Sequence, residues 1–252
     1  MEIFSTIVYQ PIFNLLVYIY NVIPGHDIGV AIIIITFIIK LVLYIPSKKS
    51  IKSQKELATL QPAIEALKEE YKDDKDKMGP ELMALYKKKG VNPFSSCLPM
   101  LIQLPFLFAI YRVFFNGLTN ENAMDSLYSF VANPGMLDPI AFGFINFADK
   151  SIWLALLAGA GQFWQSKMLM AKKKPGSGGG AMAGMGAQMT YIMPIFTVFI
   201  GSRFPAGLTF YWFLSTVFSV IQQYMVLGFG KKKKDQPEVI DAPKQDQQKK
   251  NT

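Results

Sequence analysis

Five long apolar runs alternate with polar, lysine-rich stretches along the chain. They occupy residues 29–45, 94–116, 151–170, 189–202 and 207–228. Apolar stretches of about 20 residues are typical of membrane-spanning helices, and several of these runs are shorter than that. Short spans are accommodated by tilting or by local thinning of the bilayer. The pattern therefore predicts an all-α, polytopic membrane protein built on a five-helix transmembrane bundle.

The segments between these runs complete the predicted organisation. In these segments, apolar residues at helical spacing indicate a helix, and the absence of such spacing indicates a loop. In chain order we expect an external interfacial amphipathic helix at 1–28, a first span at 29–46, a cytoplasmic helical hairpin at 47–92, a second span at 93–116, an external loop at 117–150, a third span at 151–170, a flexible cytoplasmic loop at 171–188, a fourth span at 189–203, a fifth span at 207–228 and a basic, disordered cytoplasmic tail at 229–252.

The distribution of positive charge orients the spans. Lysine and arginine number eleven in 47–93, four in 167–188 and seven in 229–252, which makes 22 of the 26 in the chain. Two more lie within spans, and only Lys150 and Arg203 fall in the alternate loops. Because cytoplasmic loops carry the excess of positive residues, the three lysine-rich segments are predicted to be cytoplasmic. The N-terminus is then outside and the C-terminus inside.

The first 28 residues contain no Lys or Arg, which excludes the basic start of a secretory signal peptide. Apolar residues recur there at helical spacing with polar residues between them, and Pro11 kinks or divides the segment. We interpret 3–22 as an amphipathic helix lying on the outer interface. The alternative, a sixth span, would move the N-terminus inside, against the charge count.

Residues 47–92 are charged and have a helical pattern. Residues 72–77 interrupt the apolar seam, Gly79-Pro80 can start a second arm with proline at its first helical position, and 87–90 can end it. Pro62 should bend the first arm. We predict a helical hairpin, with a solvated linker as the alternative. The apolar seam repeats at alternating intervals of three and four residues, the spacing of two packed helices. It consists of Leu57, Leu60, Ile64, Leu67 and Tyr71.

The two remaining cytoplasmic segments differ in composition. The loop at 171–188 is rich in glycine, so we expect it to be a flexible tether. The tail is polar and cannot form a core. Its first lysines are candidate contacts for ribosomal RNA or for anionic lipid, and a simple orientation signal is the alternative. These lysines are Lys231, Lys232, Lys233 and Lys234.

The scarcity of cysteine and histidine excludes several classes of chemistry. Cys97 has no partner within the chain for a disulfide, and Cys97 with His26 cannot make a recognisable zinc site. No glycine-rich phosphate loop, nucleophile motif or close carboxylate pair is present in a span. We therefore predict a protein that is not an enzyme, with no catalytic residue, metal or cofactor.

Lys40 is the most informative residue, because it interrupts an otherwise uncharged apolar run. A charge at this depth usually faces a bundle interior or a water-filled cavity. The alternative is snorkelling, since Lys40 lies only six residues before Pro46, about 9 Å along a helix. Thr36, four residues earlier, shares its helical face. Further candidates for a polar lining, or for hydrogen bonds between helices, are Gln103, Gln162, Gln165, Ser215, Ser219 and Gln222.

Several sequence motifs, taken together in chain order, resemble those of the YidC-type membrane protein insertases. That family includes the mitochondrial oxidase-assembly and chloroplast albino insertases. The resemblance runs from about residue 3 to residue 234 and looks like a compact bacterial form without a large periplasmic domain. The motifs are Ala31 to Lys40, Leu60-Gln-Pro62, Met83 to Lys87, Val91-Asn-Pro93, Cys97 to Pro105, Phe204 to Leu208 and Tyr211-Trp212.

The resemblance implies a hydrophilic groove inside a five-helix core, open to the cytoplasm and to lipid and closed toward the outside. Lys40 takes the position of the central positive residue, where relatives commonly carry arginine. An arginine keeps its proton, whereas a desolvated lysine can lose it. The predicted groove residues are Lys40, Thr36, Gln103, Gln165, Tyr211 and Trp212.

The function implied is non-covalent insertion of nascent transmembrane segments into the bacterial plasma membrane, without nucleotide hydrolysis. The predicted partners are nascent membrane proteins, the ribosome and the lipid bilayer, together with the general secretion channel and the signal recognition receptor. A small solute or ion carrier is the alternative, although no inverted repeat relates 29–116 to 151–228. A scaffold that uses the hairpin for docking is a third hypothesis, and it leaves the charged, proline-broken bundle unexplained.

Overall fold

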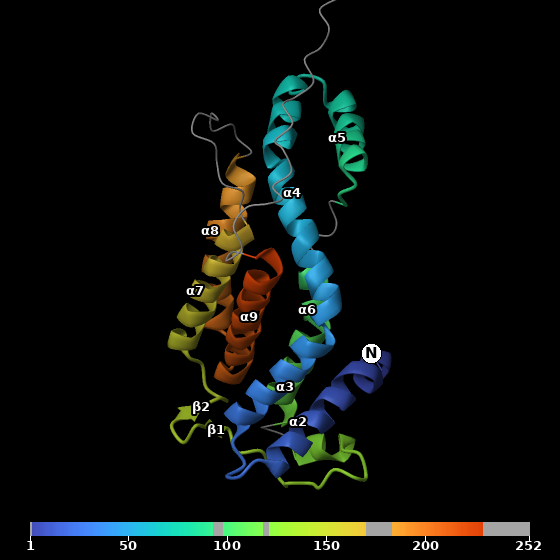
Figure 1. Ribbon diagram of the computed structural model, residues 1–252. Coiled ribbons are helices and arrows are strands. Elements are labelled where there is room, and N and C mark those ends of the chain that lie inside the picture. The colour runs from blue at the N-terminus through green and yellow to red at the C-terminus, as the bar shows by residue number, and fades with distance from the viewer. Residues whose placement is uncertain (1, 93–97, 118–120, 170–182, 229–252) are drawn as a thin grey trace, which may run out of the picture.

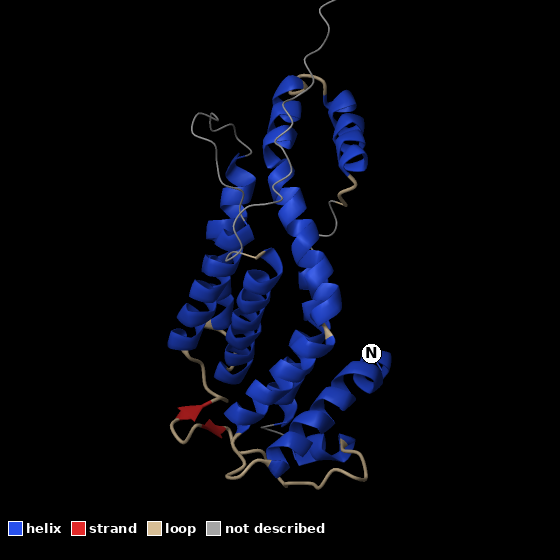
Figure 2. Ribbon diagram, viewed as in Figure 1, coloured by secondary structure: helices blue, strands red, loops and turns tan. Residues whose placement is uncertain are grey.

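Helices dominate the computed structural model, which describes residues 2–92, 98–117, 121–169 and 183–228 (Figures 1 and 2). The elements are α1 (Glu2–Phe4), the π-helix η1 (Ser5–Tyr9), α2 (Gln10–Val22), α3 (Ile28–Val42), α4 (Tyr44–Glu70), α5 (Lys75–Lys89), α6 (Leu98–Arg112), the π-helix η3 (Val113–Gly117), the 3₁₀-helix η4 (Glu121–Ser126), β1 (Ile140–Ala141), β2 (Ile145–Asn146), α7 (Ile152–Leu169), α8 (Ala183–Gly201) and α9 (Ala206–Leu227).

The fold is mostly helical, as the all-α expectation requires, and one short pair of strands that was not expected lies in the predicted external loop. There β1 and β2 pair antiparallel, with Ile140 opposite Asn146. Gly143, in the turn between them, has φ +77°, a conformation that glycine adopts without strain. Two residues a strand are too few to leave an alternating pattern in the sequence, so the pair was not predictable from periodicity.

A sharp break separates α3 from α4. The two helices are bent by 69° at Leu43, whereas the sequence predicted one span running to residue 46. Pro46 explains the difference, because it has no N–H to donate to the carbonyl of Val42 and its ring crowds that carbonyl. Lys40 is consequently placed in the last turn of α3, three residues before the bend.

Beyond the bend, α4 and α5 lie antiparallel and project from one end of the molecule (Figure 1). The prediction that Pro80 begins the second arm is wrong. The Asp74 carboxylate accepts a hydrogen bond from Lys77 N at 3.2 Å and caps a helix that starts at Lys75. Gly90, with φ +64°, ends that helix as predicted.

The described part of the predicted external loop, residues 121–150, is called the outer loop below, and it is tied to α2 at the end of the molecule opposite the hairpin. The Asn14 amide donates to Ser126 O at 3.1 Å, and its oxygen accepts from Tyr128 N at 2.6 Å. Tyr20 Oη accepts from Asp138 N at 3.1 Å. Side chains of α2 thus satisfy backbone groups of a long irregular segment, which buries one face of α2 against protein.

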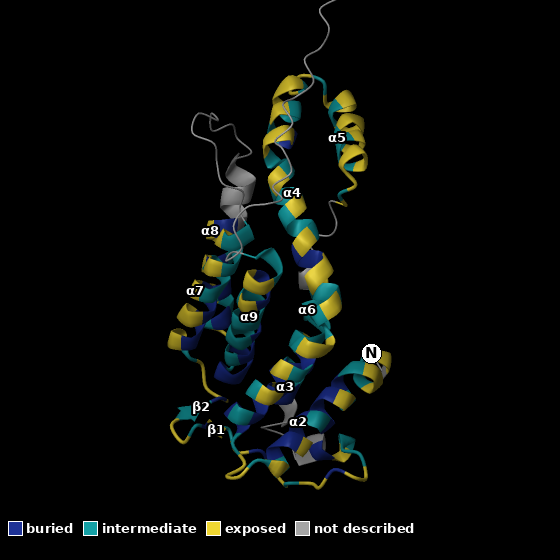
Figure 3. Ribbon diagram, viewed as in Figure 1, coloured by how far each residue is buried: buried dark blue, intermediate teal, exposed yellow. Residues whose placement is uncertain are grey.

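The apolar core is concentrated at this same end. It is built from α2, α3, α6, the outer loop and the start of α9, and its largest side chains include Phe13, Phe147, Ile32 and Tyr211. Figure 3 shows this buried region giving way to exposed residues along α4 and α5. α9 packs against α3, α6 and α7, so it joins the two sides of the bundle.

Among the described residues, one helix, α9, is long and apolar enough by itself to cross a membrane. The bent pair of α3 and α4 adds a second if the two are taken as one broken span. Apolar helices also cover Leu101–Phe115 and Thr190–Gly201, but both are shorter. Length and composition of these helices therefore give one or two full spans, and the count of five remains a prediction.

Candidate functional site

Lys40 meets two helices that are remote in sequence. Its Nζ donates to Ser219 Oγ on α9 at 3.1 Å and makes a longer contact of 3.5 Å with Gln103 Oε1 on α6. The position of Lys40 in the last turn of α3 places its ammonium group between these two helices. The charge of Lys40, which interrupts the apolar run of the first predicted span, is thus directed into the protein.

Gln103 connects Lys40 to the start of α9. Its Nε2 donates to Tyr211 Oη at 2.7 Å, and its Oε1 accepts from Ser215 Oγ at 3.1 Å. Ser219 Oγ in turn donates to Ser215 O at 2.9 Å. Tyr211, Ser215 and Ser219 are four residues apart, so they form one stripe on α9. We call Lys40, Gln103, Tyr211, Ser215 and Ser219 the polar cluster.

The polar cluster begins where the apolar core ends. Tyr211 is 1% exposed and belongs to both, while Lys40 and Ser219 are half-buried. A buried phenol must place its hydroxyl on a partner, and Gln103 supplies that partner. The side chains between these helices are therefore apolar toward the outer loop and polar toward the α3–α4 break.

The positive charge of Lys40 has neutral partners. In the part of the chain that the structure describes, ion pairs join Lys72 to Glu69 at 3.3 Å and Lys77 to Asp74 at 2.8 Å, both near the tip of the hairpin. None involves Lys40. A partly buried charge with only hydroxyl and amide partners keeps its field available to another negative or polar group.

Of the other predicted groove residues, Thr36 lies closest to Lys40 in the chain. Its hydroxyl donates to Ile32 O at 2.6 Å, one turn back on the same helix, and its side chain is fully buried. In this arrangement the hydroxyl satisfies its own helix.

Trp212 and Gln165 are half-buried. Trp212 follows Tyr211 on α9 and therefore points in another direction, and its carbonyl accepts from Thr216 Oγ1 at 2.9 Å. Gln165 lies on α7. Among the described side chains, no hydrogen bond joins either residue to the polar cluster. The structure thus brings together Lys40, Gln103 and Tyr211 from the predicted groove residues.

Gln222 and Gln223 are two further polar residues of α9, beyond Ser219. The Gln222 amide donates to Tyr44 O at 2.9 Å, which connects α9 to the first residue of α4. Gln223 was missed in the sequence, although two adjacent amides in an apolar run were a usable signal. Its side chain is 1% exposed, and its Oε1 is buried without a hydrogen-bond partner.

Some predicted features lie outside the described residues. They are the lysines at 231–234, Cys97 and residues 171–182 of the glycine-rich loop. Within the described ranges, no group of three or more His, Cys, Asp and Glu side chains could hold a metal ion.

Comparison with known proteins gives consistent matches over most of the chain. A family model described as "60Kd inner membrane protein" matches residues 18–234. The chain is 36% identical over 233 residues to the membrane protein insertase YidC of Rickettsia rickettsii (strain Sheila Smith). It is 35% identical to that of Rickettsia massiliae (strain Mtu5) and 34% to that of Rickettsia typhi (strain ATCC VR-144 / Wilmington). Each match covers 89% of this chain but 39% of the relative, so the chain spans about two fifths of the relatives' length.

Proposed function

This chain belongs to the YidC-type family of 60Kd inner membrane proteins, and we propose that it is a membrane protein insertase of the bacterial plasma membrane. The observation that carries the proposal is the polar cluster, in which one lysine is held by neutral hydroxyl and amide groups between α3, α6 and α9. A family match alone would leave the site of action unspecified.

An insertase has to lower the free-energy barrier to moving a polar segment across the bilayer. A nascent transmembrane segment enters the bilayer readily, but the polar flank that precedes it must cross hydrocarbon. Each polar group that crosses without a hydrogen bond costs several kcal/mol. A polar surface at membrane depth lowers this cost by offering hydrogen bonds part-way, without any covalent step or nucleotide hydrolysis.

The polar cluster has the groups for this task. Ser215, Ser219 and Gln103 offer exchangeable hydroxyl and amide partners, and Lys40 attracts acidic or polar flanks. Because the partners of Lys40 are neutral, an incoming carboxylate would not have to displace another carboxylate. We infer that the flank rests there transiently while the apolar segment leaves sideways into lipid.

The proposed membrane placement follows the distribution of charge. The hairpin of α4 and α5, the loop at 171–188 and the tail lie in the cytoplasm, and the outer loop with α2 lies outside. In this orientation the polar cluster is nearer the cytoplasm than the apolar core is. The hairpin and the four lysines at 231–234 would then receive the ribosome and the nascent chain.

Reconstitution tests the proposal. The purified chain is placed in protein-free lipid vesicles, and the insertion of a short single-span client is measured by protease protection beside the flux of a small solute. Insertion above that of empty vesicles, without nucleotide and without solute flux, is the expected result. Solute flux without insertion would indicate a carrier, and neither activity would indicate a scaffold.

A further inference from the structure

The segments that carry two positive residues of the predicted outer side of the membrane pair with each other in the structure. Lys150 and Arg203 are the only Lys or Arg in the segments predicted to be external. Because positive residues are disfavoured outside, two on neighbouring backbone segments call for an explanation.

Backbone pairing brings them together. Lys150 forms an antiparallel bridge with Pro205, and Ala206 N donates to Asp149 O at 2.6 Å. Paired Cα atoms in such a bridge are about 5 Å apart, and Arg203 is two residues from Pro205, which adds about 7 Å at most. Two long side chains rooted this close can reach a single anion.

Neither side chain is neutralised by an ion pair with a carboxylate of the described chain. Both residues are exposed, and the Arg203 guanidinium lies 5.2 Å from the centre of the Phe199 ring on α8. The exposed Asp149 adjoins Lys150 and offsets one charge, which leaves the group with a net charge of +1. The cation–π contact holds Arg203 against an apolar helix face.

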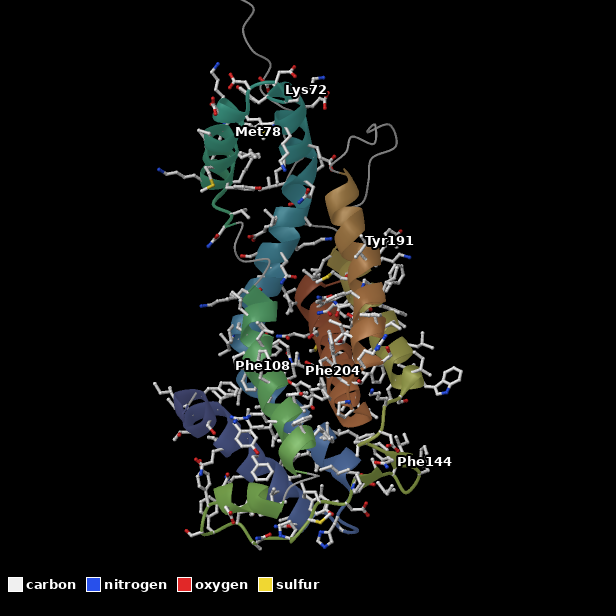
Figure 4. The ribbon with its side chains drawn as sticks, turned by 180° about the vertical axis from the view of Figure 1, so that it is seen from behind. Lys72, Met78, Phe108, Phe144, Tyr191 and Phe204 are labelled. Carbon is white, nitrogen blue, oxygen red and sulfur yellow. The ribbon has the colours of Figure 1, made fainter. Side chains whose placement is uncertain are left out.

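The surroundings of this pair are apolar and exposed. Trp153, the second residue of α7, is 75% exposed, and Phe144, at the tip of the β1–β2 turn, is 78% exposed. In Figure 4, Phe144 projects away from the protein at the end opposite the hairpin. An exposed Trp near cations is typical of the level at which lipid headgroups meet hydrocarbon.

We propose that Lys150 and Arg203 bind the phosphate of an anionic phospholipid in the outer leaflet, with Trp153 and Phe199 against its glycerol and acyl chains. The Arg203 guanidinium supplies paired N–H donors that fit phosphate oxygens, and Lys150 adds a second charge. The apolar neighbours favour a lipid over a soluble anion. This inference rests on the proposed membrane placement, and it goes beyond insertion.

The site would fix the depth of α7 and α8 at the outer surface. Exposed apolar side chains continue from it along both helices, at Leu156 and Leu157 on α7 and at Phe196 and Ile195 on α8. A headgroup held at one end of these faces aligns the adjoining acyl chain along them.

Fluorescence quenching tests the site in the full-length chain. The protein is placed in phosphatidylcholine nanodiscs that contain a small fraction of phosphatidylglycerol brominated on its acyl chains, and brominated phosphatidylcholine serves as the reference. The Trp153 signal is the difference between the chain and its Trp153→Phe variant. We expect phosphatidylglycerol to quench Trp153 more than phosphatidylcholine does, with an apparent affinity that falls about fivefold for each charge removed by Lys150→Gln or Arg203→Gln.

Two further variants sharpen the test. Asp149→Asn should raise the apparent affinity, because it removes the offsetting charge. Lys167→Gln is the matched control, since Lys167 lies over the Phe163 ring at the other end of α7, with Nζ 5.8 Å from the ring centre. It should leave Trp153 quenching unchanged.

Three results would overturn the proposal. They are equal quenching by the two lipids, a preference that survives Lys150→Gln with Arg203→Gln, and competition by millimolar glycerol 3-phosphate, which would indicate a site for soluble phosphate. Client insertion is measured separately. A chain that keeps the lipid preference without inserting clients would contradict the proposed function but not this site.

Discussion

Lys40 Nζ and Ser219 Oγ, 179 positions apart in the chain, lie 3.1 Å from each other and join α3 to α9. The lysine therefore contributes to packing as well as to the field of the polar cluster. A substitution at Lys40 changes both, so its effect on insertion has to be separated from its effect on folding.

The charge of Lys40 should matter most for clients with acidic flanks. Lys40→Arg should retain insertion, Lys40→Ala should lower it by about fivefold or more, and Lys40→Glu should lower it most, because an attraction of at least roughly 1 kcal/mol at 4 Å is lost or reversed. The measurement is the insertion yield of one single-span client with acidic, neutral or basic flanks, at equal amounts of folded insertase. Equal yields for every variant and flank would reject an electrostatic role for Lys40.

Removing the unpaired buried amide of Gln223 should raise stability. Gln223→Leu removes a buried oxygen that lacks a partner, so the free energy of unfolding should rise by about 1 kcal/mol or more. Gln222→Leu is the neighbouring control, and it should lower stability because it breaks the bond to Tyr44 O. Denaturant unfolding in detergent is measured for both variants, and a less stable Gln223→Leu protein would contradict the prediction.

Gly207 should not tolerate a methyl group. A Cβ there would lie 2.1 Å from the Phe114 ring, which is itself buried against Phe147. Gly207→Ala should lower the free energy of unfolding by about 1–3 kcal/mol, and part of the loss should be recovered in the double variant with Phe114→Leu. Gly161→Ala on α7 is the control, since its Cβ would lie 3.3 Å from the nearest neighbouring atom, a methyl carbon of Thr216, and it should change stability far less than Gly207→Ala does.

Asp27 should stabilise two elements at once. Its carboxylate caps α3 by accepting from Val30 N at 3.0 Å, and it also accepts from Phe142 N in the outer loop. Asp27→Ala should lower stability by about 1–2 kcal/mol and speed amide hydrogen exchange at both Val30 and Phe142. Asp74→Ala removes a comparable cap on the exposed hairpin, so faster exchange should stay within α5. If amide exchange became faster only within α3 in Asp27→Ala, the contact with Phe142 N would not contribute to stability.

The orientation can be checked with single cysteines in a Cys97→Ser background. An impermeant thiol reagent added to intact cells should label Pro24→Cys and Phe130→Cys, and it should leave Lys75→Cys and Gly180→Cys unlabelled until the membrane is opened. Labelling of position 75 from outside would overturn the proposed topology.

Features with local causes were predictable from the sequence. The predicted segments at 151–170 and 207–228 agree closely with α7 and α9, because runs of apolar residues mark their own ends. Gly90 ends α5 through its left-handed conformation, which glycine alone adopts freely. Lys40 and Gln103 were both identified because polar groups in an apolar run are rare.

Features that depend on tertiary partners were not predictable. Helical spacing correctly puts Thr36 on the face of Lys40, but it does not reveal that the hydroxyl bonds to Ile32 O. The contact between Lys40 and Ser219 requires the arrangement of α3 against α9, which no local pattern encodes. At Pro80 two signals competed, and the Asp74 cap begins the helix although proline at the first helical position is usually favoured.

The break at Leu43 gives the fold the geometry of a lever. α4 is 27 residues long, or about 40 Å, and it starts four residues after Lys40. A tilt of about 5° at that pivot would therefore carry the hairpin tip through roughly 3.5 Å while displacing Lys40 far less. The bond from Gln222 to Tyr44 O lies at this pivot, and the packing of α4 against α6, α7 and α9 adds to it, so these contacts together limit the movement of the arm.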